Sequence, residues 1–110
     1  MFAVPEVSLR QWVEIEAAAG IPEGSGRSVR AGERRLAVFR HDGRWFALDD
    51  ACPHQGASLG EGLFHGGRVI CPLHGWVFEV ATGRCPRDSH EGVRTYPVRR
   101  TERGIEVQLS

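Results

Sequence analysis

Two short motifs of cysteine and histidine carry side chains that can bind a metal. The first is Cys52-Pro-His54, and the second, Cys71-Pro-Leu-His74, follows it after sixteen intervening residues. A thiolate and an imidazole two or three residues apart, on a loop bent by proline, can point at one small volume. Two such loops enclose a site with two sulfur and two nitrogen donors, which suits either tetrahedral Zn²⁺ or an iron-sulfur cluster. Ligand type alone leaves that choice open.

The elements that must position these motifs are predicted to be short strands. Glycine supplies 14 of the 110 residues and proline six, which favours many tight turns and disfavours long helices, so we expect an all-β fold. Short runs of β-branched or aromatic residues, bounded by turn signals, recur along the chain. These runs cover residues 12–15, 26–30, 35–40, 45–48, 68–71, 76–80, 94–99 and 105–109.

Turn residues predict how several of these runs are joined. Asp42-Gly43 lies between the runs 35–40 and 44–48 and predicts a hairpin, because both residues tolerate a positive φ. Further hairpin turns are expected at 81–83 and 102–104, and a short helical turn within 14–19. The one stretch with no predicted element is 49–67, which holds the first motif. A loop of that length in a small domain indicates function.

Composition limits the classes of protein that the chain can be. Its 14 basic residues balance its 14 acidic ones, which argues against attraction to nucleic acid or to acidic membranes. The longest strongly apolar run is the four residues 45–48, far below the roughly 20 that span a bilayer. No secretory signal is readable in residues 1–10, so we expect a cytoplasmic protein with a single domain over residues 1–110.

Beyond the four residues themselves, the sequence around both motifs resembles the ligand boxes of Rieske proteins. The resemblance includes Gln55-Gly56 after the first motif and Gly75-Trp76 after the second, and extends through residues 44–50, 76–83 and 93–98. It implies an antiparallel sheet sandwich with a tip of two loops that binds one 2Fe-2S cluster. By position, Cys52 and Cys71 would bind the inner iron, and His54 and His74 the outer iron.

The resemblance also implies a function, because the spacing between the boxes is that of soluble Rieske ferredoxins. Such a protein carries one electron from a flavoprotein reductase to a partner oxygenase and performs no bond chemistry. The chain has no Gly-x-Gly-x-x-Gly fingerprint or phosphate loop of its own. Two alternatives remain open. One is the small subunit of an NADH-dependent nitrite reductase, which residues 82–85 and 93–98 resemble, and the other is a zinc-binding structural module.

A low reduction potential is expected within the Rieske range. High-potential members carry a disulfide between the two boxes, and the matching positions here are Ala57 and Leu73. Those members also place hydroxyl donors near the cluster sulfurs, where this chain has Trp76 and Phe78. Losing donors to sulfur disfavours the more negative reduced state, so we expect a potential near the lower end, about −150 mV.

The remaining candidates are interpreted as structural. Cys85 is expected to be a buried or half-buried thiol, since the other two cysteines are assigned to metal. The four arginines within 94–103 are interpreted as a solvated face rather than a docking patch. Three histidines are interpreted as solvated surface residues: His41, His65 and His90. Three aromatic residues are expected in the core: Trp12, Trp45 and Phe46. Three leucines are expected to shield the cluster or to form an apolar rim: Leu59, Leu63 and Leu73.

Overall fold

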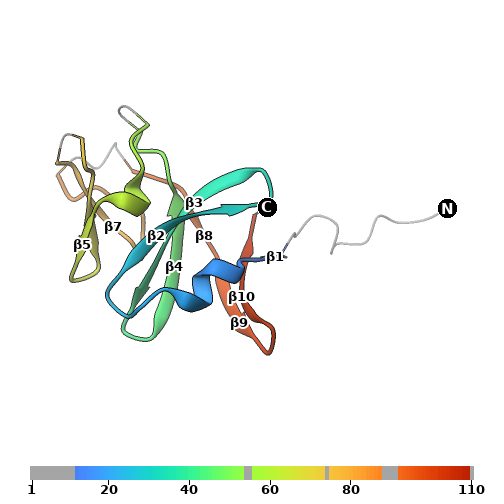
Figure 1. Ribbon diagram of the computed structural model, residues 1–110. Coiled ribbons are helices and arrows are strands. Elements are labelled where there is room, and N and C mark those ends of the chain that lie inside the picture. The colour runs from blue at the N-terminus through green and yellow to red at the C-terminus, as the bar shows by residue number, and fades with distance from the viewer. Residues whose placement is uncertain (1–11, 54–55, 74, 88–91, 110) are drawn as a thin grey trace.

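A computed structural model describes residues 12–53, 56–73, 75–87 and 92–109, and in these segments the chain forms short antiparallel strands with two short 3-10 helices (Figure 1). The expected all-β class is therefore confirmed. The elements are β1 Trp12–Glu14, η2 Glu16–Gly20, β2 Gly26–Ala31, β3 Arg34–His41, β4 Arg44–Asp49, η3 Leu59–Glu61, β5 Leu63–His65, β6 Arg68–Ile70, β7 Val77–Glu79, β8 Thr95–Tyr96, β9 Val98–Thr101 and β10 Gly104–Gln108. Among the described residues, no helix has the length and apolar character needed to cross a bilayer.

Three antiparallel sheets surround two separate hydrophobic cores. The central sheet has the strand order β2-β3-β4-β8, and the outer sheets have the orders β1-β10-β9 and β5-β6-β7. Strand β3 belongs to both cores, because successive side chains of a strand point to opposite faces. Leu36 and Val38 lie in the core shared with β10, whereas Ala37 and Phe39 lie in the core shared with β6 and β7. The central sheet thus carries one outer sheet on each face.

The hairpin predicted at Asp42-Gly43 is confirmed. Strands β3 and β4 pair in antiparallel register, with His41 opposite Arg44, and Asp42 and Gly43 have φ values of 53° and 75°. Both angles lie in the left-handed region that a two-residue hairpin turn of this type requires. The predicted run 94–99 divides into two strands. Pro97, which has no backbone N–H to donate, separates β8 of the central sheet from β9 of an outer sheet.

Two expectations are corrected by the structure. The stretch 49–67 is not without elements, because it contains η3 and strand β5. The turn at 81–83 exists, but the chain after it adds no strand to the β5-β6-β7 sheet, and Arg84 instead forms a single bridge with Gly92. The other two expectations for turns agree with the structure: the short helical turn is η2, and the hairpin at 102–104 joins β9 to β10.

Candidate functional site

The structure brings Cys52 and Cys71 into the same buried core. Cys52 follows the end of β4 and Cys71 follows β6, and both side chains are nearly inaccessible to solvent. They share a cluster with Phe39 of the central sheet and Phe78 of β7. The loops that carry them lie at the same end of the molecule, at the upper left of Figure 1. His54 and His74 lie outside the described residues.

The first cysteine loop is closed by two backbone hydrogen bonds. The N–H of Cys52 donates to the carbonyl oxygen of Ala57 at 2.8 Å, and the carbonyl oxygen of Cys52 accepts from the N–H of Gly56 at 2.8 Å. Gly56 has a φ of 71°. This left-handed conformation favours glycine because it places a Cβ against the following carbonyl oxygen.

The second cysteine loop has the same closure. The N–H of Cys71 donates to the carbonyl oxygen of Trp76 at 2.7 Å, and the carbonyl oxygen of Cys71 accepts from the N–H of Gly75 at 3.1 Å. Gly75 has a φ of 75°. The proline-kinked motifs of the sequence therefore correspond to two loops of matching backbone geometry, each of which starts at a buried thiol.

A third loop shares this geometry and has no cysteine at its start. The N–H of Glu79 donates to the carbonyl oxygen of Arg84 at 2.8 Å, and the N–H of Gly83 donates to the carbonyl oxygen of Glu79 at 2.7 Å. Gly83 has a φ of 76°. The closure is thus a general solution for a tight loop in this fold, and a cysteine at the first position distinguishes the two loops of the predicted site.

Asp50 supports the first loop through its side chain. It is 3% exposed, and its carboxylate accepts hydrogen bonds from the Ser28 hydroxyl at 3.0 Å, the Ser58 hydroxyl at 2.9 Å and the Gly60 N–H at 2.8 Å. Sequence reasoning missed this residue. The sequence did offer one signal: Asp50 directly follows an apolar strand and lies two positions before a predicted ligand. An acidic residue at such a place is buried only where several donors surround it.

Three exposed apolar side chains lie close to the second loop along the chain. Leu63 is 74% exposed, Leu73 is 53% exposed and Ile70 is 36% exposed. Leu63 and Ile70 are directly opposite each other on β5 and β6, so their side chains share one face of that sheet. Leu59 differs from the other two predicted leucines, because it is fully buried in the core that contains both cysteines.

The donor set fits a 2Fe-2S group. Two thiols in one apolar core match the soft sulfur ligands of such clusters. The loop glycines leave the space beside them open, because a Cβ at Gly56 or Gly75 would lie more than 4 Å from every described residue other than its chain neighbours. The assignment of Cys52, His54, Cys71 and His74 as ligands stays a prediction. Cys85 is buried in the same core, as expected of a structural thiol.

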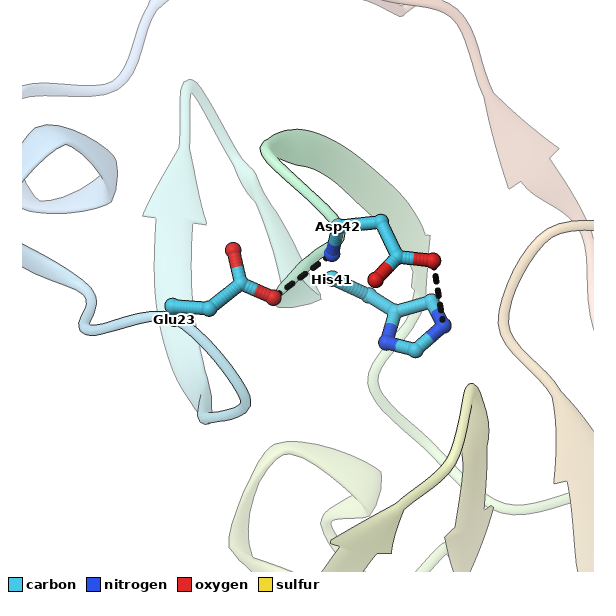
Figure 2. Close-up of side chains that lie close together, drawn as sticks. All are labelled: Glu23, His41 and Asp42. Atoms are coloured by element: carbon cyan, nitrogen blue, oxygen red, sulfur yellow. Dashed lines mark hydrogen bonds and ion pairs between the residues drawn. The ribbon is translucent and has the colours of Figure 1, made fainter.

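His41 is less exposed than the sequence suggests. Its ring is half-buried and stands edge-on to Phe64, with ring centroids 5.9 Å apart. Figure 2 shows His41 beside Asp42 and Glu23, with 3.4 Å between His41 Nε2 and Asp42 Oδ2. Glu23 accepts hydrogen bonds from the backbone N–H groups of Gly43 and Asp42, and these bonds lower the pKa of its carboxyl. The hydrogen bonds to Glu23 therefore stabilise the β3–β4 turn.

Of the other two histidines, His65 is exposed as expected, and His90 lies outside the described residues.

The arginines of the last hairpin lie over aromatic rings at the surface. The guanidinium carbon of Arg99 is 4.0 Å from the centroid of the Trp12 ring, and its Nε is 2.8 Å from Glu106. The guanidinium carbon of Arg100 is 5.7 Å from the centroid of the Trp45 ring. Both arginines are exposed, as a solvated face requires. Trp45 and Phe46, expected in the core, are half-buried and pack against the edges of the two cores, one on each. Trp12, also expected in the core, is half-buried.

Tyr96 and Asp49 form a polar contact on the face of β4 opposite to the first loop. The Tyr96 hydroxyl donates to Asp49 Oδ1 and accepts from Arg34 at 3.1 Å. Burial raises the pKa of Tyr96, and the hydrogen bond to Asp49 raises it further. Tyr96 belongs to the core shared with β10. Asp49 therefore contacts that core, whereas the adjacent Asp50 supports the loop of Cys52, which lies in the other core.

Comparison with known sequences gives a consistent family. The pattern of the Rieske [2Fe-2S] domain matches residues 11–97. The ferredoxin subunit of anthranilate 1,2-dioxygenase from Burkholderia cepacia is 35% identical over 106 residues, which cover 94% of this chain and 97% of the relative. The ferredoxin component of the naphthalene 1,2-dioxygenase system from Pseudomonas aeruginosa is 32% identical over 102 residues, which cover 91% of this chain and 97% of the relative.

Solved structures show the same fold. One matching chain comes from a complex of reduced oxygenase and oxidized ferredoxin in carbazole 1,9a-dioxygenase. Its TM-score is 0.77 at 34% identity, covering 87% of this chain and 91% of that one. Another is a protein assigned as an NADH-dependent nitrite reductase small subunit from Mycobacterium tuberculosis. Its TM-score is 0.80 at 26% identity, covering 92% of this chain and 96% of that one.

Proposed function

The chain belongs to the Rieske [2Fe-2S] domain family, and from that premise we propose that it is a one-electron carrier that passes electrons from a flavoprotein reductase to a terminal oxygenase. The cofactor of this family is one Rieske-type 2Fe-2S cluster, which supplies one-electron redox chemistry. The protein itself then makes and breaks no substrate bond. It acts in the cytoplasm as one component of a larger oxidoreductase system.

The four predicted ligands divide between the two sides of the cluster. Cys52 and Cys71 would hold the inner iron, and His54 and His74 would hold the outer iron. Burial of both cysteines in one core supports the first half of this assignment. Mixed ligation raises the potential above that of a cluster with four cysteines, because two neutral imidazoles replace two negative thiolates.

The surroundings of the cysteines support a potential near −150 mV, about the lower end of the Rieske range. Phe78 is fully buried in the core of the cysteines, and neither Phe78 nor Trp76 has a hydroxyl to donate. A potentiometric titration followed by electron paramagnetic resonance measures this directly. A clearly positive potential would contradict the low-potential assignment and leave the carrier function standing.

The apolar surface beside the second loop supports docking of an oxygenase. Among the described residues, the exposed large apolar side chains are Leu63, Ile70 and Leu73. Leu73 lies in the loop that starts at Cys71, and Leu63 and Ile70 pair on the adjoining strands. A partner that covers this surface brings its own redox centre near the loop, and desolvating these side chains favours the contact.

The observation that carries the proposal is the pair of matching loops, each starting at a buried cysteine, in a chain similar to oxygenase ferredoxins over most of its length. The test combines the purified protein with an NADH-dependent flavoprotein reductase and a Rieske terminal oxygenase. We expect iron and acid-labile sulfide at two of each per chain, reduction by the reductase and reoxidation by the oxygenase. Absence of iron and sulfide after anaerobic preparation would contradict the proposal.

A second candidate function is the small subunit of an NADH-dependent nitrite reductase, favoured by the TM-score of 0.80 to a protein assigned to that class. It predicts a stable complex with a sirohaem-containing reductase in place of electron transfer to an oxygenase. Membership of this family excludes the other alternative, a zinc-binding structural module, because the family's cofactor is an iron-sulfur cluster.

A further inference from the structure

Asp50 is the one charged side chain that is buried in the described part of the chain. It lies two residues before Cys52, directly after strand β4. Burying a carboxylate is unfavourable unless several donors replace its water, so a position of this kind has a structural cause. The cause is visible in its hydrogen-bond partners, which come from the exit of the loop and from strand β2 of the central sheet.

The two carboxylate oxygens of Asp50 accept hydrogen bonds from different parts of the chain. Oδ1 accepts from the Ser58 hydroxyl at 2.9 Å and from the Gly60 N–H at 2.8 Å, and both residues lie where the chain leaves the loop. Oδ2 accepts from the Ser28 hydroxyl on β2 at 3.0 Å. Arg35 of β3 donates to the same hydroxyl at 3.3 Å. The carboxylate therefore ties the exit of the loop to the central sheet.

The backbone of Asp50 fixes the same region from the other side. Its carbonyl oxygen accepts from the N–H of Leu59 at 2.7 Å, and its N–H donates to the carbonyl oxygen of Arg35 at 3.2 Å. Gly60 packs tightly on β2, because a Cβ there would lie 2.4 Å from the backbone nitrogen of Ser28. Both ends of the loop that carries Cys52 are thus held at Asp50, with little room for movement.

We propose that Asp50 is a positioning residue for the cluster: its buried carboxylate, bound by Ser28, Ser58 and Gly60, fixes the loop so that the Cys52 thiol is placed for ligation. This inference rests on the proposed function, since it assumes that Cys52 is a ligand. It adds a residue outside the four-ligand set. The carboxylate acts through the loop and not by contact with the metal.

The test uses two variants of Asp50 and a matched control on the opposite face of β4. Asp50→Ala removes the carboxylate, and Asp50→Asn keeps its shape and one acceptor oxygen. Asp49→Ala removes the neighbouring carboxylate, which accepts a hydrogen bond from Tyr96 of the core shared with β10. Each protein is purified with its cluster. The measurements are iron and sulfide content, the rate of iron release to a chelator, the electron paramagnetic resonance g-values of the reduced state, and the melting temperature.

We expect Asp50→Ala to release iron about tenfold faster than the parent, the scale seen when groups that orient metal ligands are removed. The cluster that remains in this variant should show shifted g-values, because the Cys52 thiol is displaced. Asp50→Asn should recover most of both properties. Asp49→Ala should lower the melting temperature while its g-values and release rate stay those of the parent.

The inference is overturned if iron release follows the melting temperature alike in Asp50→Ala and Asp49→Ala and the g-values stay unchanged in both. Should Asp50→Ala fail to fold, Ser58→Ala removes one donor from the loop exit and is read by the same measurements. Parent-like release and g-values in that variant then overturn the inference. A parent protein that holds no iron or sulfide contradicts the proposed function instead, so the two failures are distinguishable.

Discussion

The two cysteine loops share one backbone closure but are supported in different ways. The loop from Cys71 to Trp76 joins strands β6 and β7, where Ile70 is paired with Val77. Its closing hydrogen bond therefore continues a regular antiparallel ladder. The loop from Cys52 to Ala57 has only an isolated bridge beneath it, between Ala51 and Ser58, after which the chain turns into η3. The Asp50 carboxylate takes the place of the missing ladder.

The same loop closure can therefore be supported by local contacts or by distant ones. The second loop is set by strands that are neighbours in sequence, as in any hairpin. The first loop depends on Ser28, which lies 22 residues away from Asp50. We therefore expect the two loops to respond equally to loss of a ligand and unequally to loss of their supports.

The largest effect is expected when either cysteine is replaced. Cys52→Ser and Cys71→Ser should each abolish the cluster, because both thiolates are proposed ligands of the inner iron. Iron and sulfide analysis of the purified variants checks this. Cys85→Ser is the control in the same core: it should keep the cluster and lose about 1–3 kcal/mol of unfolding free energy for a buried hydroxyl. Retention of a normal cluster in either of the first two variants would refute the assignment.

Alanine at the shared glycine position separates strain from crowding across the three loops. At Gly56 and Gly75 a Cβ meets no described residue beyond its chain neighbours within 4 Å, so the expected cost is that of the left-handed backbone, about 1–2 kcal/mol. At Gly83 a Cβ would also lie 2.1 Å from the Val93 carbonyl oxygen, which raises the expected loss to about 3 kcal/mol. Urea unfolding of the three variants gives the order. Equal losses of unfolding free energy at all three positions would contradict this order and show that the chain around Gly83 moves to make room for the Cβ.

The apolar surface belongs to the sheet of the second loop, so docking should be sensitive on that side. Leu63→Asp is expected to slow electron transfer to the oxygenase about tenfold, the usual scale for one central contact of an interface. Stopped-flow reoxidation measures the rate, and the reduction potential should not change. Ala19→Asp adds the same charge on η2 and should be neutral. Equal slowing by both variants would indicate a general charge effect.

The smallest effect concerns Tyr96, on the face of β4 away from the loops. Its pKa is raised in the folded protein, chiefly by burial, so its contribution to stability is complete below the ordinary value of about 10 and is lost as the pH rises above it. Tyr96→Phe should remove this alkaline loss. Urea unfolding from pH 8 to 11 checks the difference in slope, and parallel curves for parent and variant would contradict it.

Much of the fold could be predicted because its signals are local. Asp42-Gly43 between two β-branched and aromatic runs indicates one hairpin, and the structure has it. The signals are weaker where an element is short and rich in glycine. Strand β5 has three residues and η3 has a glycine in its centre, so periodicity could not reveal either.

The burial of both cysteines at the candidate site could be predicted from the sequence, and the residues that support the loops could not. The cysteine motifs are visible as text, and the structure places both thiols in one core. The partners of Asp50 are not visible, because Ser28 and Gly60 are brought to it only by the packing of η3 on β2. Leu59 illustrates the same limit: in sequence it resembles Leu63, but η3 turns it inward and leaves Leu63 in solvent.

The pairing of β1 with β10 places the first and last strands of the described domain next to each other, with Trp12 opposite Gln108. A host polypeptide could therefore receive this unit at a surface turn through two short connectors, because entry and exit are adjacent. The same adjacency permits circular permutation, with new ends opened at the exposed β3–β4 turn, which lies outside both cysteine loops. The redox module is in this sense portable.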